Sequence, residues 1–399
     1  MRLESMLRFS LVAAATAMMS AQSPKQVVNV GPSPGLPFSS AVKAGGLVYV
    51  SGSIAIDPGG KTSGDIRAQT KATLDGLAAT LKAAGSSMPM AASVMVYLRH
   101  ASDFPAMNEV YRTYWPKDPP ARTTTVAPLA LPEALVEISM VAVPNGGDRH
   151  VVHPEGWLAS PNPYSYGIQT GNTLFLSGLI SRNGRDNTAV QGDMTAQTKT
   201  VLENGAAILK AAGMSYADVA SARVFIADSS KFQEMNAAYR PFFPSAPPAR
   251  ATVKAGLTSP DYLVEITMVA VKDPARKAIT TPNADGSPGT PNPNLSSAIE
   301  AGNRLFIAGT LGTTSDNAGQ TGAQTKETLA RIERTLKAAG YDWPQVVETM
   351  VYLPDIGTFG EMNDAYRAAL KKDFPARTTI ESGLMGAGGA VEIMMTAAR

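Results

Sequence analysis

The spacing of apolar residues predicts an α+β unit near the start of the chain. Short apolar runs at residues 41–43 and 47–52 are separated by glycines, which is typical of a β-hairpin. From residue 74 to residue 81 leucines recur every three or four positions, and Gly85 follows. This spacing places one apolar stripe on a helix that ends at the glycine.

Later segments complete the unit. Ala92–Leu98 is predicted to be a strand, Phe104–Trp115 a second helix, and Thr123–Ala130 and Leu135–Val143 two closing strands. The predicted order is therefore ββαβαββ, an α+β fold with its helices on one face of the sheet.

The same pattern occurs three times along the 399 residues. Each repeat contains Pro-Ala-Arg and, fifteen residues after the arginine, a glutamate in a Val-Glu-Ile strand. Successive arginines lie 128 and 127 residues apart, so the period is that of a whole domain and not of a solenoid unit. We therefore divide the chain into copy 1 (residues 24–145), copy 2 (150–272) and copy 3 (280–399), each large enough for its own core.

The joining segments and one helix position differ between the copies. Residues 144–157 link copies 1 and 2, and residues 272–294 link copies 2 and 3. The second linker is rich in Pro, Gly, Asn and Thr and is predicted to be flexible. In copy 2, Gly205 stands where the apolar stripe would carry a large residue, so we expect a local weakness in that helix.

Residues 1–23 resemble a secretory signal peptide. Arg2 and Arg8 precede an uncharged run from Phe9 to Ala21, and small residues offer cleavage sites. The run is too short to span a bilayer. We expect a periplasmic or secreted protein; a frayed tail or a start at Met6 is the alternative and would leave it cytoplasmic. The absence of cysteine fits either compartment.

Composition narrows the function classes. The formal net charge is +2 at pH 7 and there is no long Lys/Arg run, so no nucleic-acid partner is expected. The sequence contains no glycine-rich phosphate loop and no serine nucleophile elbow. His150 and His153 occur once, in a linker, so no metal site is predicted.

The repeated arginine is the first candidate for chemistry. Arg122, Arg250 and Arg377 each enter an apolar strand, where a charge must be paired or must face a cavity. The planar guanidinium suits a small carboxylate. A structural salt bridge to the strand glutamate is the alternative, and the recurrence alone does not decide between them.

The repeated glutamates, Glu137, Glu265 and Glu392, lie between aliphatic neighbours in core-like strands. If the two closing strands of copy 1 form one hairpin, Glu137 lies opposite about Val126, roughly 13 Å from Arg122 at the usual strand rise. Pairing within a copy is therefore not expected, and a site assembled across two copies is favoured. Pairing of each glutamate with some other basic group stays open.

Two polar positions accompany each arginine. A threonine lies two residues after each arginine and therefore on the same strand face; these are Thr124, Thr252 and Thr379. Its hydroxyl could hydrogen-bond a ligand, or the threonine could be present only because β-branched residues favour strands. An asparagine fourteen residues earlier begins an Asn-x-x-Tyr segment of the second helix; these are Asn108, Asn236 and Asn363. For the asparagines, the residues alone favour core packing or local backbone bonding.

Together, Pro-Ala-Arg, the Val-Glu-Ile strand, the Met-Asn-x-x-Tyr helix and the Ser-Gly pairs at 51–52 and 177–178 resemble the Rid family, the reactive intermediate deaminases of YjgF type. The resemblance covers nearly all of residues 27–399. It implies chorismate-mutase-like domains, here three in tandem that form a pseudo-trimer with clefts between copies. It also implies hydrolysis of enamine or imine intermediates of amino acids to 2-keto acids, with no cofactor and no metal.

The resemblance also assigns roles to residues. It implies a carboxylate-binding arginine at Arg122, Arg250 and Arg377, and a water-positioning glutamate at Glu137, Glu265 and Glu392. It implies substrate contacts at Thr124, Thr252, Thr379, Asn108, Asn236, Asn363, Gly52 and Gly178, and an N-terminal aromatic residue at Phe38 and Tyr164. Copy 3 departs from the pattern, with Leu295 in place of the aromatic residue and Ala308 in place of the serine.

Two other functions stay open. A binding module for small carboxylates would keep the arginine and the threonine without turnover, and a ribonuclease would be expected to show a basic groove. The expected partner is a small imino or keto acid, with no membrane association. Because three copies can close one ring, we expect a monomer with internal pseudo-threefold symmetry.

Overall fold

The computed structural model describes residues 25–31, 35–57 and 59–399, so the predicted signal peptide lies outside it. Each copy forms the predicted ββαβαββ unit, and a short strand is added at the edge of each sheet. In copy 1 the elements are β1 (Gln26–Val28), β2 (Ala41–Ala44), β3 (Leu47–Ser53), α1 (Ile66–Ala83), β4 (Ala91–Leu98), α2 (Phe104–Tyr114), β5 (Ala121–Val126) and β6 (Val136–Ala142).

The other two copies repeat this order. Copy 2 consists of β7 (His150–Val152), β8 (Gly167–Thr170), β9 (Thr173–Leu176), α3 (Met194–Ala211), β10 (Val219–Ile226), α4 (Phe232–Tyr239), β11 (Ala249–Lys254) and β12 (Val264–Val271). Copy 3 and the linker before it contain β13 (Lys277–Ile279), β14 (Ala298–Ala301), β15 (Arg304–Leu311), α5 (Thr321–Ala338), β16 (Val346–Leu353), α6 (Phe359–Leu370), β17 (Ala376–Glu381), β18 (Gly383–Leu384) and β19 (Glu392–Ala398). Strand β18 joins the sheet of copy 2, where it pairs with β11.

The two closing strands of a copy do not form the hairpin considered from the sequence. The sheet order is β1-β2-β3-β6-β4-β5, so β4 lies between β6 and β5. On β4, Tyr97 pairs with Glu137 on one side and with Thr125 on the other. Strand β5 runs parallel to β4, which requires a crossover, and α2 supplies it. Arg122 therefore lies two strands away from the glutamate of its own copy, and the expectation that they do not pair holds for a different reason.

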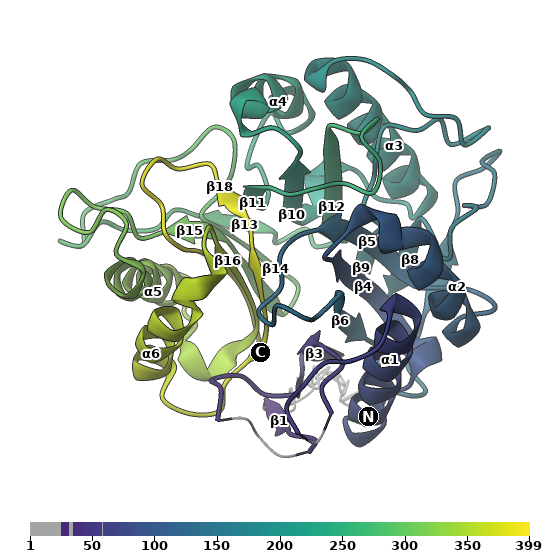
Figure 1. Cartoon of the computed structure of the whole chain (residues 1–399). Coiled ribbons are helices and arrows are strands. Elements are labelled where there is room, and N and C mark those ends of the chain that lie inside the picture. The colour runs from purple at the N-terminus through teal and green to yellow at the C-terminus, as the bar shows by residue number, and fades with distance from the viewer. Residues whose placement is uncertain (1–24, 32–34, 58) are drawn as a thin grey trace, which may run out of the picture.

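Each copy packs its two helices on the outer face of its sheet, and the helices lie at the periphery of the molecule (Figure 1). Helix α1 starts after Asp65, whose side chain accepts a hydrogen bond from the Ala68 amide at 2.9 Å, and Gly85 ends the segment with φ of 75°. The predicted leucine stripe is buried in the core of copy 1. None of the described helices is both long and apolar enough to cross a membrane.

The inner faces of the three sheets meet at the centre. Tyr97, Phe225 and Tyr352 occupy matching positions in β4, β10 and β16, and all three are fully buried in one cluster that the copies share. These strands are consequently apolar at most positions of both faces, because the helices cover one face and the neighbouring copies cover the other; Arg223 and Glu348 are among the exceptions.

The ring of copies closes within one chain. The amide of Ser165 in copy 2 donates to the Pro120 carbonyl of copy 1 at 3.1 Å, and Ser296 of copy 3 donates to Pro248 of copy 2 at 3.2 Å. The third contact of this kind returns from copy 1 to copy 3, where the Ser39 amide donates to the Pro375 carbonyl at 3.1 Å. The three interfaces are therefore equivalent, as pseudo-threefold symmetry requires.

At Gly205, where a local weakness was expected, another side chain fills the space. A Cβ atom on Gly205 would lie 2.5 Å from the Tyr216 hydroxyl and 2.9 Å from Met268 Cε. The Tyr216 hydroxyl donates to the Leu202 carbonyl of the same helix. The helix therefore has no empty space at this position, and the sequence pattern could not show which neighbour reaches it.

The crowded surroundings of Gly205 and the open surroundings of Gly76 in α1 give a matched pair of helix substitutions. Gly205→Ala is expected to destabilise the protein by about 1–3 kcal/mol, because Tyr216 and Met268 must move. Gly76→Ala, in an exposed part of α1 with no atom within 4 Å of the added Cβ, is expected to stabilise it by about 0.5–1 kcal/mol. Thermal unfolding of the two variants measures both effects, and shifts of the same sign would contradict this account of Gly205.

Candidate active site

Three sites lie between copies, and each combines an arginine from one copy with a glutamate from the next. The first site holds Arg122 and Glu265, the second Arg250 and Glu392, and the third Arg377 and Glu137. The first is a cleft of about 40 Å³ that Arg122, Thr124, Tyr164, Gly178 and Glu265 line together. The structure thus brings the predicted arginines and glutamates together across copies.

A glycine in each copy makes room for the glutamate. In copy 1 the pairing of β3 with β6 shifts register between Val50 and Ser53, as in a β-bulge, and Gly52 lies within this shift. A Cβ atom on Gly52 would lie 1.9 Å from Glu137 Oε1. The same distance separates such an atom on Gly178 from Glu265 and one on Gly309 from Glu392. Any larger residue would displace the carboxylate, so the glycine positions it.

Each arginine lies over the ring of a tyrosine from the second helix of its own copy. The Cζ atoms of Arg122 and Arg250 lie 4.6 Å from the ring centres of Tyr111 and Tyr239, and that of Arg377 lies 5.0 Å from Tyr366. Sequence reasoning did not assign these tyrosines to the site, although their constant spacing from the asparagines was the available signal. A ring face favours a cation that burial has separated from water.

The asparagines hold the arginines in copies 2 and 3. Arg250 Nη2 donates to Asn236 Oδ1 at 2.6 Å, and Arg377 Nη2 donates to Asn363 Oδ1 at 2.7 Å. The interpretation of these residues as core packing or local backbone bonding was therefore wrong. Asn108 differs: its Nδ2 donates to Asn162 at 3.3 Å, and its Oδ1 has no partner in the described part of the chain.

Several buried polar atoms at these sites have no partner among the described residues. They include the hydroxyls of all three predicted threonines, the Arg122 Nη1 and the Glu137 Oε2; the threonines are Thr124, Thr252 and Thr379. A buried donor or acceptor without a partner costs about 1–3 kcal/mol. The threonine hydroxyls recur without a partner at the same position of all three copies, so they are available to a ligand.

Burial changes the protonation of the site. It raises the pKa of Glu137, Glu265 and Glu392 to about 8 in each case, and the arginine of the preceding copy only partly opposes this rise. Burial also lowers the pKa of Arg377 to about 10. At neutral pH the free site therefore holds a charged arginine and a predominantly protonated glutamate.

The second site is less complete than the other two. Tyr164 and Phe38 place rings 5.9 Å from Arg122 Cζ and 5.4 Å from Arg377 Cζ, whereas copy 3 offers Leu295 at that position. Ser177 and Ser51 each accept a hydrogen bond from the amide of the arginine, at 3.1 and 2.8 Å. Ala308 replaces this serine beside Arg250.

Six residues that line the cleft of the first site were not predicted, and Phe104, Pro161, Ile180 and Thr258 are four of them. Asn162 and Arg182 line its cleft, and the Arg182 Nη1 donates to Tyr262 at 3.0 Å. Neither residue recurs in the other copies, so comparison of the repeats gives no signal for them. Within residues 25–31, 35–57 and 59–399, no group of three or more His, Asp or Glu gathers as metal ligands.

The geometry defines a class of protein: a ring of three α+β domains with Arg/Glu sites between neighbours. A family model described as Endoribonuclease L-PSP matches residues 29–144, 157–272 and 288–399, so the chain belongs to this family, in three copies. This is the Rid family to which the sequence pointed.

The chain is also similar to individual relatives and solved structures. A RutC family protein of Sulfurisphaera tokodaii is 44% identical over 110 residues, which are 28% of this chain and 88% of that protein. A Yersinia pestis protein of the conserved Rid family, described as of unknown function, is 29% identical and covers 31% of this chain and 99% of its own, with a TM-score of 0.30. A chorismatase covers 78% of this chain and 93% of its own at 14% identity and a TM-score of 0.56, which shows a shared fold alone.

Proposed function

We propose that this protein hydrolyses reactive enamine or imine intermediates of amino acids to 2-keto acids. The observation that carries the proposal is the meeting of a buried arginine and a buried glutamate from adjoining copies, beside a threonine hydroxyl that lacks a partner. The guanidinium suits a small carboxylate, and the cleft of about 40 Å³ admits only a small acid.

The chemistry needs positioning more than a strong nucleophile. The arginine and the threonine hydroxyl bind the substrate carboxylate, which fixes the imine carbon near the glutamate. The protonated glutamate donates its proton to an enamine carbon or to an imine nitrogen. As a carboxylate it then takes a proton from the water whose oxygen bonds to that carbon. The glutamate returns this proton to nitrogen and takes the proton of the new hydroxyl group as the C–N bond breaks, which releases ammonia and the keto acid and leaves the glutamate protonated again.

A coupled assay tests this proposal. An amino-acid oxidase generates imine in the presence of the purified protein, and the release of keto acid is followed against the spontaneous rate. We expect faster release with the protein than without it. A rate equal to the spontaneous one, together with measurable binding of a small keto acid, would instead identify a binding module without turnover.

The description of the family model names an endoribonuclease, so RNA cleavage is the second candidate activity. The composition does not support RNA cleavage, because a protein with a net charge of +2 and no basic run attracts a polyanion only weakly. Incubation of the same preparation with single-stranded RNA distinguishes the two activities.

The closed ring supports a further proposal, that the protein is a monomer. All three interfaces form within one chain, so a second chain has no interface to complete. We expect sedimentation equilibrium to give the mass of one chain, at most 41.7 kDa. A mass of three chains would show that the copies of different chains combine.

A further inference from the structure

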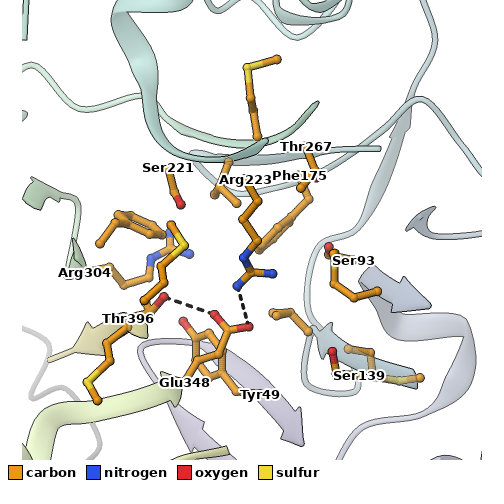
Figure 2. A pocket seen from close by; sticks show the side chains of 18 residues that line it. Tyr49, Ser93, Ser139, Phe175, Ser221, Arg223, Thr267, Arg304, Glu348 and Thr396 are labelled. Carbon is orange, nitrogen blue, oxygen red and sulfur yellow. Dashed lines mark hydrogen bonds and ion pairs between the residues drawn. The ribbon is translucent and has the colours of Figure 1, made fainter. Parts of the chain in front are cut away.

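A second kind of cavity lies at the centre of the ring. It has a volume of about 50 Å³, and matching strand positions of all three copies line it (Figure 2). Tyr49, Phe175 and Phe306 are one such set. A single water needs ~10–15 Å³ of such space, so the cavity has room for a few waters or for one small ion. It shares no lining residue with the cleft of the first site.

The copies differ most where they face this cavity. Glu348 of copy 3 stands where copies 1 and 2 have serine, and Arg223 of copy 2 stands where the others have methionine. Arg223 Nη2 and Glu348 Oε1 form an ion pair at 3.3 Å, and Thr396 donates to Glu348 Oε2 at 3.2 Å (Figure 2). These two charges balance each other.

Arg304 carries a third charge in the cavity lining, which this ion pair does not neutralise. It stands where copies 1 and 2 have Leu47 and Thr173, and it is only 4% exposed. Its Nη2 donates to the neutral Thr173 hydroxyl, and its Cζ lies 5.7 Å from the Phe306 ring centre. Its Nε has no partner in the described part of the chain. A guanidinium buried with only neutral partners is costly unless an anion accompanies it.

A second donor lies near Arg304. Tyr49 is 3% exposed, and burial raises the pKa of its hydroxyl to about 12, so that it stays protonated at neutral pH. Glu348 adds to this rise, whereas the charge of Arg304 and a side-chain contact with it oppose the rise. A guanidinium can only donate, so the proton of the Tyr49 hydroxyl has no acceptor among the described residues. Copies 2 and 3 have phenylalanine at this position, so the hydroxyl, like Arg304, occurs once.

We propose that the central cavity binds one small monovalent anion, a halide or a carboxylate of the size of formate, between Arg304 Nε and the Tyr49 hydroxyl. The anion neutralises the surplus charge at the centre of the ring and satisfies both donors. The site is thus chemically distinct from the interface sites, and binding there does not depend on imine hydrolysis.

Crystals grown with sodium bromide test the location of the anion. We expect an anomalous bromine peak within hydrogen-bonding distance of Arg304 Nε and Tyr49 Oη in the intact protein, and no such peak in Arg304→Leu, which carries the residue of copy 1. Bromide at surface cations alone, or a central peak that survives Arg304→Leu, would overturn the proposal.

Thermal unfolding tests the same site in solution. At constant ionic strength, chloride or formate replaces gluconate, which is too large for the cavity. We expect a saturating rise of the unfolding temperature in the intact protein. Tyr49→Phe, the residue of the other two copies, should weaken the apparent affinity about threefold to tenfold, as expected for one lost hydrogen bond.

The control is Arg185→Leu, which removes an equal charge from an exposed position and should leave the titration unchanged. If Arg304→Leu does not fold, Tyr49→Phe still decides the question. An affinity that Tyr49→Phe leaves unchanged, or a rise without saturation, would show that the anion does not bind between these two groups.

Discussion

Imine hydrolysis is expected to disappear when Arg122, Arg250 and Arg377 are all replaced by alanine. Each guanidinium is buried, and a bond from it to a substrate carboxylate would be shielded from water. Loss of one partner of such a pair costs on the order of 2–5 kcal/mol, a factor of about thirty to several thousand in rate. The coupled assay on the triple variant measures this loss.

The control for this variant is Arg185→Ala, an exposed arginine whose loss should leave the rate unchanged. The triple variant should still unfold cooperatively, because the glutamate left at each site is predominantly neutral below pH 8. Full activity in a folded triple variant would end the arginine-centred mechanism.

The single variants should lose unequal shares of the activity. Arg250→Ala is expected to cost least, since its site lacks the aromatic ring and the serine that the other two sites have. In a protein with only Arg250 intact, Leu295→Tyr combined with Ala308→Ser should raise the remaining rate, because it restores the arrangement of the first site. Equal losses in the three single variants would show that the three sites contribute equally, but would not contradict the arginine-centred mechanism.

The recurrence of the arginine and the glutamate in three copies identified the residues of the site, but not how they meet. The expectation that they do not pair within a copy rested on a hairpin that does not form. In the structure β4 separates their strands, and the glutamate of the next copy lies near the arginine. The leucine stripe of α1 was predictable from local geometry, since a helix fixes which side chains share a face.

Contacts between segments distant in sequence could not be predicted in this way. The bond from Arg250 to Asn236 depends on how α4 packs on its sheet, and the filling of the space at Gly205 depends on Tyr216. Strand β18 pairs Gly383 with Lys254 of another copy, and Gly256 makes the matching contact with Val126 of copy 1, although the residues involved are more than a hundred positions apart. The cavity around Arg304 exists only because three non-identical sheets meet.

The stability of the protein is expected to fall as the pH rises from about 5 to about 9. In the fold, the pKa of each of the three site glutamates is about 8, above the ordinary value of 4.5 that the unfolded chain retains. Between these values the folded state binds more protons than the unfolded state, so stability decreases with pH. This contribution is full below about pH 4.5 and is lost as the pH passes through about 8. One pKa unit corresponds to about 1.4 kcal/mol, so the three glutamates together change the free energy of unfolding by several kcal/mol.

Combined replacement of Glu137, Glu265 and Glu392 by glutamine isolates this effect. Glutamine keeps the shape of the side chain and an oxygen that can accept the Thr124 amide, but it cannot ionise. Unfolding temperatures of the variant and the intact protein should be similar near pH 5, and the variant should be several degrees more stable near pH 9.

Other titrating groups, such as Lys25, whose pKa burial lowers to about 8, are present in both proteins and cancel in the comparison. Glu155→Gln, at an exposed position, is the control and should follow the intact protein throughout. Parallel curves for the triple variant and the intact protein would show that the three carboxyl groups do not carry raised pKa values in the fold.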